Sequence, residues 1–226
     1  MEKNLLSVSL ATAAIACALV APLPAVAQQA ETPEAADSTS VESETDRGSR
    51  VGITAEMAEA SWTSPGGEPV TVTRDQTSGA TLTGDWALTG HDCPPFCIQP
   101  MSPAPGVTTV GELELIEAMK AGDTILVDGR TPDWFAGGTI PGAINVPFTQ
   151  AVERLAELGC EPDFDGKFDC ADASNVILFC NGIWCGQSPA AIRAMVGAGY
   201  PVDRIHYYRG GMLAWRLLGL TVAGGK

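Results

Sequence analysis

The sequence predicts an α/β domain with a mainly parallel sheet in the second half of the chain. From residue 106 onward, short apolar segments alternate with segments of helical spacing, which is typical of parallel strands connected by helices. One apolar segment, residues 124–128, ends at Asp128. Another, residues 176–179, leads directly into Cys180. Ligands bind beyond the carboxyl ends of the strands in such sheets, so we expect Asp128 and Cys180 close to a functional site.

Each element of this domain has its own local signal. Strands are predicted where a few apolar residues, some of them β-branched, stand between turn residues. Helices are predicted where apolar residues recur at helical spacing or where glycine or proline marks an end. The predicted strands are residues 124–128, a short segment after the glycine-rich loop 137–147, residues 176–179 and residues 204–208. The predicted helices are residues 111–121, a short turn after Pro132, residues 150–158, residues 188–196 and a last helix from residue 210.

The segment around Cys180 delivers a cysteine into a glycine-bearing loop and then starts a helix. Ser188 is a suitable N-cap, and Pro189 stands where the first helical residue belongs. A thiol between a strand end and a helix N-terminus lies among unpaired backbone N–H groups, and this setting favours the thiolate of Cys180. Free cysteines at the end of apolar strands are also commonly inert core residues, so the segment alone leaves both interpretations open.

The composition restricts the classes of partner. The chain has 226 residues and a formal net charge of −14. Nucleic acids and anionic membranes both require a basic surface, so the charge argues against both as partners. A small anionic substrate must find a local positive field from backbone dipoles or from a few arginines.

The first 27 residues have the pattern of a secretory signal peptide. Lys3 precedes an apolar run over residues 5–20, and an A-x-A cleavage pattern ends at Ala27. The apolar run lacks the length and the flanking residues of a membrane span. We therefore expect export to an oxidising compartment, the periplasm of a bacterium.

The remaining chain divides by composition. Residues 28–50 are rich in acids and small polar residues and predict a disordered acidic linker. Residues 51–105 predict a small N-terminal extension, with a short helix over residues 55–60 and β segments at residues 69–73 and 80–83. Residues 106–226 form the predicted α/β domain.

Six of the seven cysteines remain after Cys17 leaves with the signal peptide. Sequence alone does not choose among their pairings, although disulfides are the default in an oxidising compartment. Cys93 and Cys97 stand beside His91, but a zinc site needs more ligands, so a disulfide, local or distant, or a redox pair is expected instead of a metal site. Cys160 and Cys170 flank an acidic insertion and suit a disulfide loop. No metal or cofactor is predicted.

Three blocks in the second half resemble the rhodanese-like single-domain sulfurtransferase family. The first is Ile-Leu-Val-Asp-Gly-Arg at residues 125–130, followed by Asp-Trp-Phe at 133–135. The second is Gly-Thr-Ile-Pro-Gly-Ala-Ile-Asn-Val-Pro at residues 138–147, and the third is Tyr-Tyr-Arg-Gly-Gly-Met-Leu-Ala-Trp at residues 207–215. The resemblance covers about half of the chain and implies a five-stranded, mainly parallel sheet with helices on both faces.

The resemblance also implies roles for particular residues. It places the persulfide-forming nucleophile on Cys180 and a supporting structural role on Asp128 and Arg130. Thr139 stands where many relatives have histidine, and the loop lacks the arginine or lysine of many active relatives. The chain is similar instead to the branch with a Cys-x-Gly-x-x-Cys loop, with Cys185 as its second cysteine. The implied substrate-binding loop consists of Asn181, Gly182, Ile183, Trp184, Gly186, Gln187 and Ser188.

In the chemistry that the resemblance implies, a Cys180 thiolate takes the outer sulfur of a donor such as thiosulfate and passes it to a thiol or to cyanide. Backbone N–H groups of the loop would hold the anion. Cys185 could resolve a persulfide or a sulfenic acid on Cys180 and close a disulfide within the loop, or it could merely pack. No cofactor is needed.

Two other functions remain open from the sequence. One is a catalytically silent rhodanese-like module that binds a partner. The other is a thiol–disulfide oxidoreductase that uses Cys180 with Cys185, or the Cys93 and Cys97 pair, and exchanges electrons with a periplasmic redox partner. The expected small-molecule partners of the sulfurtransferase are a sulfur-containing anion and a thiol acceptor.

Overall fold

The computed structural model describes residues 50–165 and 167–224 of the chain. The predicted signal peptide and all but the last residue of the predicted acidic linker lie outside these residues. Among the described helices, none combines the length and the apolar character that a membrane crossing requires.

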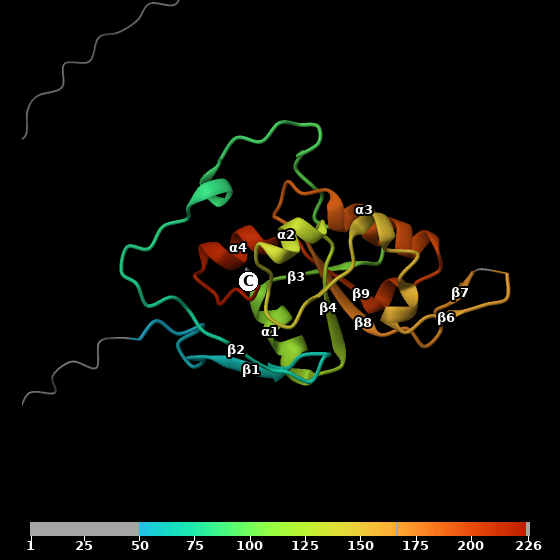
Figure 1. Ribbon diagram of the computed structural model, residues 1–226, viewed down its shortest axis with the longest axis horizontal. Helices are drawn as coiled ribbons and strands as arrows, with labels where there is room; N and C mark the ends of the chain where they lie inside the picture. Colours follow the sequence, from blue (N-terminus) through green and yellow to red (C-terminus); the bar gives the residue numbers. More distant parts are fainter. Residues whose placement is uncertain (1–49, 166, 225–226) are drawn as a thin grey trace, which may run out of the picture. The chain divides into compact units, whose positions relative to one another are not determined.

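A five-stranded parallel sheet lies at the centre of the domain, as predicted (Figure 1). β8 is the middle strand, and its neighbours β4 and β9 are both parallel to it. Asp128 at the end of β4 is in register with Phe179 at the end of β8, so Cys180 follows at the same edge of the sheet. In sheet order the strands are β3 (Thr108–Val110), β9 (Ile205–Tyr208), β8 (Asn175–Phe179), β4 (Thr124–Asp128) and β5 (Ile144–Asn145).

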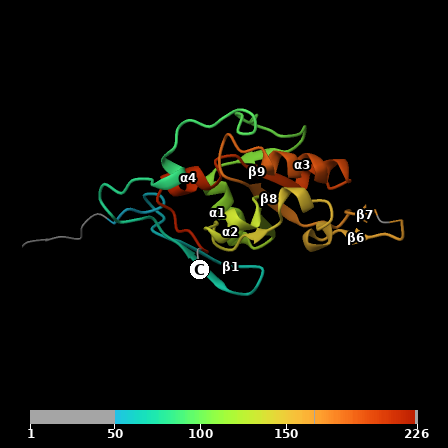
Figure 2. The ribbon, with the colours of Figure 1, turned by 45° about the horizontal axis from the view of Figure 1, so that its top comes forward.

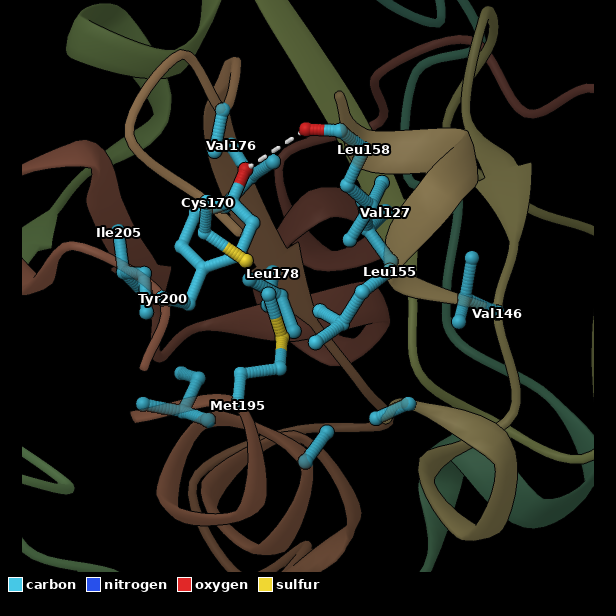
Figure 3. Packing of buried hydrophobic residues seen from close by; sticks show 14 of the residues in the cluster. Val127, Val146, Leu155, Leu158, Cys170, Val176, Leu178, Met195, Tyr200 and Ile205 are labelled. Atoms are coloured by element: carbon cyan, nitrogen blue, oxygen red, sulfur yellow. Dashed lines mark hydrogen bonds between the residues drawn. The ribbon is translucent and has the colours of Figure 1, made fainter. Parts of the chain in front are cut away.

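Helices cover both faces of the sheet, which confirms the predicted architecture. On one face, α3 (Gln187–Gly197) and two 3-10 helices, η2 (Phe148–Gln150) and η3 (Leu155–Leu158), enclose a core with the alternate side chains of β4, β8 and β9. Figure 3 shows this core, with Leu178 and Met195 facing each other and the hydroxyl of Tyr200 donating to the carbonyl oxygen of Leu158 at 3.2 Å. On the other face lie α1 (Glu112–Ala121) and α4 (Gly211–Leu217).

Several predicted elements differ from the observed ones. The predicted helix over residues 150–158 is replaced by 3-10 segments, whose period of three places Leu155 and Leu158 together in the core while Val152 is exposed. The predicted helix at residues 55–60 is absent from the structure, because the hydroxyl of Thr54 accepts the backbone N–H groups of Glu56 and Met57 and forms a turn.

The extension forms a hairpin that packs on the sheet domain. β1 (Ala60–Thr63) pairs antiparallel with β2 (Pro69–Val72), whereas the predicted segment at residues 80–83 forms no strand. Buried Trp62 and Val72 of this hairpin share one core with Leu115 and Ile116 of α1. Residues on both sides of the predicted domain boundary at residue 105 therefore contribute to the same core.

After the hairpin, the chain runs past α4 before it enters the sheet at β3 (Figures 1 and 2). This connection contains the short 3-10 helix η1 (Gly84–Ala87) and the Cys93–Cys97 disulfide. A second disulfide, Cys160–Cys170, closes the hairpin of β6 (Glu161–Pro162) and β7 (Phe168–Asp169). These are two of the pairings that the sequence left open.

Candidate active site

The loop after β8 turns back on itself and is held by the start of α4. The backbone N–H of Cys185 donates to the carbonyl oxygen of Gly182 at 2.9 Å, which closes the turn. The N–H of Met212 donates to the oxygen of Cys180, and the N–H of Leu213 donates to the oxygen of Asn181, both at 2.9 Å. The loop that carries Cys180 is therefore fixed by hydrogen bonds from a different part of the sequence.

This close approach depends on glycine at the first residue of α4. Gly211 has a φ of +56°, a conformation that L side chains rarely adopt. A β-carbon at Gly211 would overlap the carbonyl oxygen of Cys180 and lie 2.8 Å from the nitrogen of Gly182. The glycine pair at residues 210 and 211 thus gives α4 access to the backbone of the loop.

Two free cysteines are buried together in this loop. Cys180 and Cys185 are each 1% exposed, and neither belongs to a disulfide among the described residues. The thiol of Cys180 donates to the carbonyl oxygen of Cys185 at 3.2 Å. The interaction between the two side chains perturbs the pKa of both thiols.

The lowered pKa belongs to Cys185. The hydrogen bond from the Cys180 thiol, the backbone N–H groups of Asn181 and Gln187, and the charge of Arg130 lower the pKa of Cys185 to about 7, against the effect of burial. Burial raises the pKa of Cys180, as do the hydrogen bond and the negative charge of Cys185. The pKa directions therefore favour the thiolate at Cys185 and not at Cys180, where the sequence had led us to expect it, because burial penalises charge on Cys180 most strongly.

Ser188 lies inside the helix rather than at its cap. α3 begins at Gln187 with Gly186 as its N-cap, and Ser188 is fully buried beside Gly129. The predicted N-cap role of Ser188 is therefore wrong, since its side chain packs toward the sheet edge. From there Ser188, through its backbone N–H and its hydroxyl, lowers the pKa of Cys180.

A buried ion pair supports the loop from the end of β4. The guanidinium of Arg130 donates from Nη2 to Asp128 Oδ2 at 2.6 Å and from Nε to Oδ1 at 2.9 Å, and both side chains are fully buried. Nη1 of Arg130 donates to Oδ1 of Asn181 at 3.3 Å, one residue after Cys180. Asp128 and Arg130 therefore connect the sheet edge to the loop.

Residues of the second sequence block complete the network around this ion pair. The hydroxyl of Thr139 donates to Oδ2 of Asp128 at 2.7 Å, and Nη2 of Arg130 donates to the oxygen of Gly138 at 2.6 Å. The amide of Asn145 donates to the backbone oxygens of Asp128 and Arg130, both at 2.9 Å. Thr139 and Asn145 were not predicted as site residues, although both stand in a block that the sequence had singled out.

A segment of the extension covers the loop. We call residues 84–100 the covering segment. The ring of His91 stacks on Trp184 with ring centroids 4.2 Å apart. The N–H of Gln99 donates to the oxygen of Ile183 at 2.8 Å, and the guanidinium of Arg209 donates to the oxygen of Gln99 at 2.8 Å. The sequence analysis noted His91 beside Cys93 and Cys97. No sequence pattern predicted that this segment contacts the loop after β8.

The predicted site residues fall into two groups. The loop residues, Asp128 and Arg130 lie together, and Ile183 is the exposed member of the loop. The Cys93–Cys97 disulfide lies in the covering segment, two residues from Gln99, whereas Cys160 and Cys170 belong to the core beside α3. Among the described residues, no cluster of three or more histidine, cysteine, aspartate or glutamate side chains could hold a metal ion.

An aromatic cavity of about 240 Å³ opens beside Asn181. Its lining includes Trp86 and His91 of the covering segment, Trp134 of α2 (Pro132–Ala136), and Trp184 of the loop. Trp86 meets Trp134 edge to face with centroids 5.7 Å apart. A small molecule that approaches the loop from this side would meet aromatic side chains first.

Comparison with known proteins gives a consistent result for the same region. A family model described as a rhodanese-like domain matches residues 112–218. A sulfurtransferase of Allochromatium vinosum is 30% identical over 100 residues, which are 44% of this chain and 78% of the relative. An HTH-type transcriptional regulator of Mycobacterium tuberculosis is 38% identical over 109 residues, 48% of this chain. The chain spans only 42% of the length of that regulator.

Solved structures of this kind are also similar to the chain. A thiosulfate sulfurtransferase from Pseudomonas aeruginosa is 25% identical, with a TM-score of 0.41, over 53% of this chain and 21% of that protein. A human single-domain sulfurtransferase is 23% identical, with a TM-score of 0.37, over 49% of this chain and 96% of that protein.

Proposed function

The chain belongs to the rhodanese-like family, and on this premise we propose that it is a sulfurtransferase that carries sulfur as a persulfide on Cys180. The observation that carries the proposal is the position of Cys180. It follows the middle strand of a parallel sheet directly, in a loop fixed by α4 and by the Arg130–Asn181 hydrogen bond. Nucleophiles and ligands of α/β domains occupy this edge of the sheet.

In the proposed reaction, Cys180 first loses its proton to the neighbouring sulfur of Cys185, whose thiolate is the favoured anion of the pair. The Cys180 thiolate attacks the outer sulfur of a donor such as thiosulfate, and the sulfur–sulfur bond of the donor breaks so that sulfite leaves with the electron pair. An acceptor thiolate or cyanide then attacks the outer sulfur of the persulfide. This step regenerates the Cys180 thiolate and releases a persulfide of the acceptor or thiocyanate.

The loop supports this chemistry without a basic side chain of its own. The backbone N–H groups of Asn181 and Gln187 and the charge of Arg130 all lower the pKa of Cys185. Preorganised N–H dipoles in a buried site stabilise developing negative charge at little cost in reorganisation. These groups supply the local positive field that a small anionic substrate needs, although the loop has no arginine or lysine side chain.

Thiol–disulfide exchange is a second candidate function, favoured by the burial of two free cysteines in one loop, where the Cys180 thiol donates to the backbone oxygen of Cys185. A thiolate at Cys185 could attack the inner sulfur of a Cys180 persulfide, forming a Cys180–Cys185 disulfide and releasing hydrosulfide. An external dithiol, such as a periplasmic redox partner, would then reduce the loop disulfide. In this scheme Cys185 is the resolving thiol.

We further propose that the protein works in the periplasm, after export and removal of residues 1–27. The signal pattern supports this location, and so do the two disulfides, since structural disulfides persist in oxidising compartments. Cell fractionation with N-terminal sequencing of the mature protein tests it. A cytoplasmic protein that begins at Met1 would contradict it.

The mass of the intact protein after incubation with thiosulfate tests the leading proposal. One transferred sulfur atom adds about 32 Da to the reduced protein. We expect this adduct in the wild type, slower formation of it in Cys185→Ser, which lacks the thiolate that takes the proton of Cys180, and its loss in Cys180→Ser. The two variants are matched controls for each other because they differ only in which buried sulfur remains.

The same measurement distinguishes the alternatives. An adduct that persists in Cys180→Ser and disappears in Cys185→Ser would move the nucleophile to Cys185. A loss of two hydrogens confined to the peptide with Cys180 and Cys185 would favour the oxidoreductase. A folded wild-type protein without either change would favour a silent binding module.

A further inference from the structure

A second and larger cavity, of about 940 Å³, lies beside the loop on the side of α4. Volumes of this order are typical of pockets that hold small organic ligands. Its lining includes neither Cys180 nor Cys185, so it is distinct from the buried sulfur pair. The residues that give the cavity its character are Arg74, Trp86, His91, Trp184, Leu213 and Arg216.

Two arginines of this cavity have donors without partners. The Nε atoms of Arg74 and Arg216 are both buried and have no hydrogen-bond acceptor among the described residues, and the same is true of Nε2 of His91. Neither guanidinium takes part in an ion pair within the described part of the chain. A buried donor without a partner costs free energy, more so when it is charged.

The charge balance of the protein makes these arginines unusual. The chain has 27 acidic residues against 13 lysines and arginines, so carboxylates are abundant. The cavity nevertheless has one carboxylate in its lining, that of Asp75, and this side chain accepts the backbone N–H of Thr77 instead of pairing with an arginine. Two guanidinium groups against one carboxylate give the lining of this cavity a net positive charge.

Arg216 is held in place by a contact that leaves its Nε without a partner among the described residues. Its guanidinium lies over the ring of Trp86, 4.9 Å from the centroid, which is a cation–π arrangement. Burial and the nearby charge of Arg130 lower the pKa of Arg216. A second positive group is thus packed close to the one already paired with Asp128, although the repulsion disfavours it. An anion in the cavity would relieve that cost.

We propose that this cavity binds a small organic anion, a sulfonate or carboxylate on a flat apolar body. Arg74 and Arg216 would hold the anionic group through charge-assisted hydrogen bonds. Trp86, Trp184 and Leu213 supply apolar walls for the body. Trp184 of the loop lines the cavity, whereas Cys180 and Cys185 do not. The bound anion would therefore lie next to the loop without touching the sulfur atoms. Binding of such an anion does not depend on sulfur transfer at Cys180.

Binding of benzenesulfonate, measured by titration calorimetry on the oxidised full chain, tests the proposal. We expect saturable one-to-one binding that weakens on the order of tenfold in Arg216→Gln and in Arg74→Gln, because each loses a charge-assisted hydrogen bond. Arg193→Gln is the matched control: Arg193 is exposed on α3, outside the cavity, and we expect unchanged affinity. Cys180→Ser should bind as the wild type does.

Three further ligands sharpen the outcome. Benzoate should compete with benzenesulfonate for the same site, and the tighter of the two identifies the preferred anionic group. Benzenesulfonamide, which is uncharged at neutral pH, should bind much more weakly; equal binding would overturn the role of charge. Thiosulfate that binds as tightly as benzenesulfonate would overturn the assignment to an organic anion. Unchanged affinity in a folded Arg74→Gln, Arg216→Gln double variant would overturn the site itself.

Discussion

The thiol of Cys180 donates to the carbonyl oxygen of Cys185 at 3.2 Å, and the two sulfur atoms share a buried environment in which only one carries negative charge readily. Two interacting thiols lose their protons in steps that belong to the pair. The first step lies near pH 7, where Cys185 is the favoured thiolate. Above this pH the loop therefore carries a negative charge beside Cys180.

The pH dependence of the thiolate signal follows from this arrangement. Cys180→Ala removes the hydrogen-bond donor that lowers the pKa of Cys185 most, so the remaining thiol should ionise at higher pH than the wild-type pair. Ultraviolet absorbance of the thiolate, recorded against pH, measures the midpoint. In Cys185→Ala we expect the midpoint of Cys180 to stay above the ordinary cysteine value, because burial is the largest cause that raises its pKa and the variant keeps it. Midpoints that match the wild type in both variants would contradict the coupling.

Replacing Gly211 should damage the loop more than its position on a helix suggests. Gly211→Ala introduces a β-carbon against the backbone of Cys180 and Gly182 at a φ of +56°. We expect a loss of roughly 2–4 kcal/mol in the free energy of unfolding, together with a loss of persulfide formation.

Gly197 provides the matched control for this substitution. It lies in the last turn of α3, and a β-carbon there meets no atom within 4 Å. Gly197→Ala should leave stability unchanged or raise it by about 0.5–1 kcal/mol. Denaturant unfolding measures both variants, and equal effects would show that the approach of α4 to the loop is not critical.

The buried ion pair and an exposed one should differ strongly in their contribution to stability. Asp128→Asn leaves the fully buried guanidinium of Arg130 without its counter-charge, which we expect to cost about 3–5 kcal/mol in the free energy of unfolding. Glu157→Gln breaks the partly exposed pair with Arg154 and should cost at most about 1 kcal/mol. Chemical denaturation at one pH and salt concentration compares the two, and similar losses would contradict the supporting role of Asp128.

The sequence predicted the elements whose signals are local. Thr124–Asp128 and the strand before Cys180 are continuous apolar runs, and Gly122 ends α1 in the left-handed conformation that favours glycine. The predicted N-cap role of Ser188 was wrong because the sequence does not distinguish a serine that caps a helix from one that is buried in its first turn. The raised pKa of Cys180 was also beyond the sequence, since burial is a property of the packed chain.

The contact between the covering segment and the loop is the largest feature of the site that the sequence did not predict. Its contacts join His91 to Trp184 and Gln99 to Ile183, pairs that are far apart in sequence and have no periodic pattern. Local propensity predicts turns and disulfides in such a segment but not the surface on which it lies. Thr139 differs, because it stood in a recognised block but was not predicted as a site residue, and its hydrogen bond to Asp128 became visible only in the structure.

The covering segment should control access to the buried sulfur pair. Cys180 and Cys185 are each 1% exposed, and His91 of the covering segment stacks on Trp184, the residue before Cys185. His91→Ala removes one partner of the stack, so we expect opening to become easier and alkylation by iodoacetamide to become several-fold faster. Local opening sets the rate at which buried groups react. The rate in denaturant supplies the reference for full exposure.

The disulfide in the same segment gives an independent test of its role. Replacing Cys93 and Cys97 by serine removes the local constraint beside Gln99, whereas replacing Cys160 and Cys170 removes a disulfide that lies in the α3 core. Both changes should lower stability, the second by about 2–4 kcal/mol. We expect faster alkylation of Cys180 and Cys185 from the first change under conditions where both variants are folded. Equal acceleration by the two changes would mean that access to the sulfur pair depends on global stability and not on the covering segment.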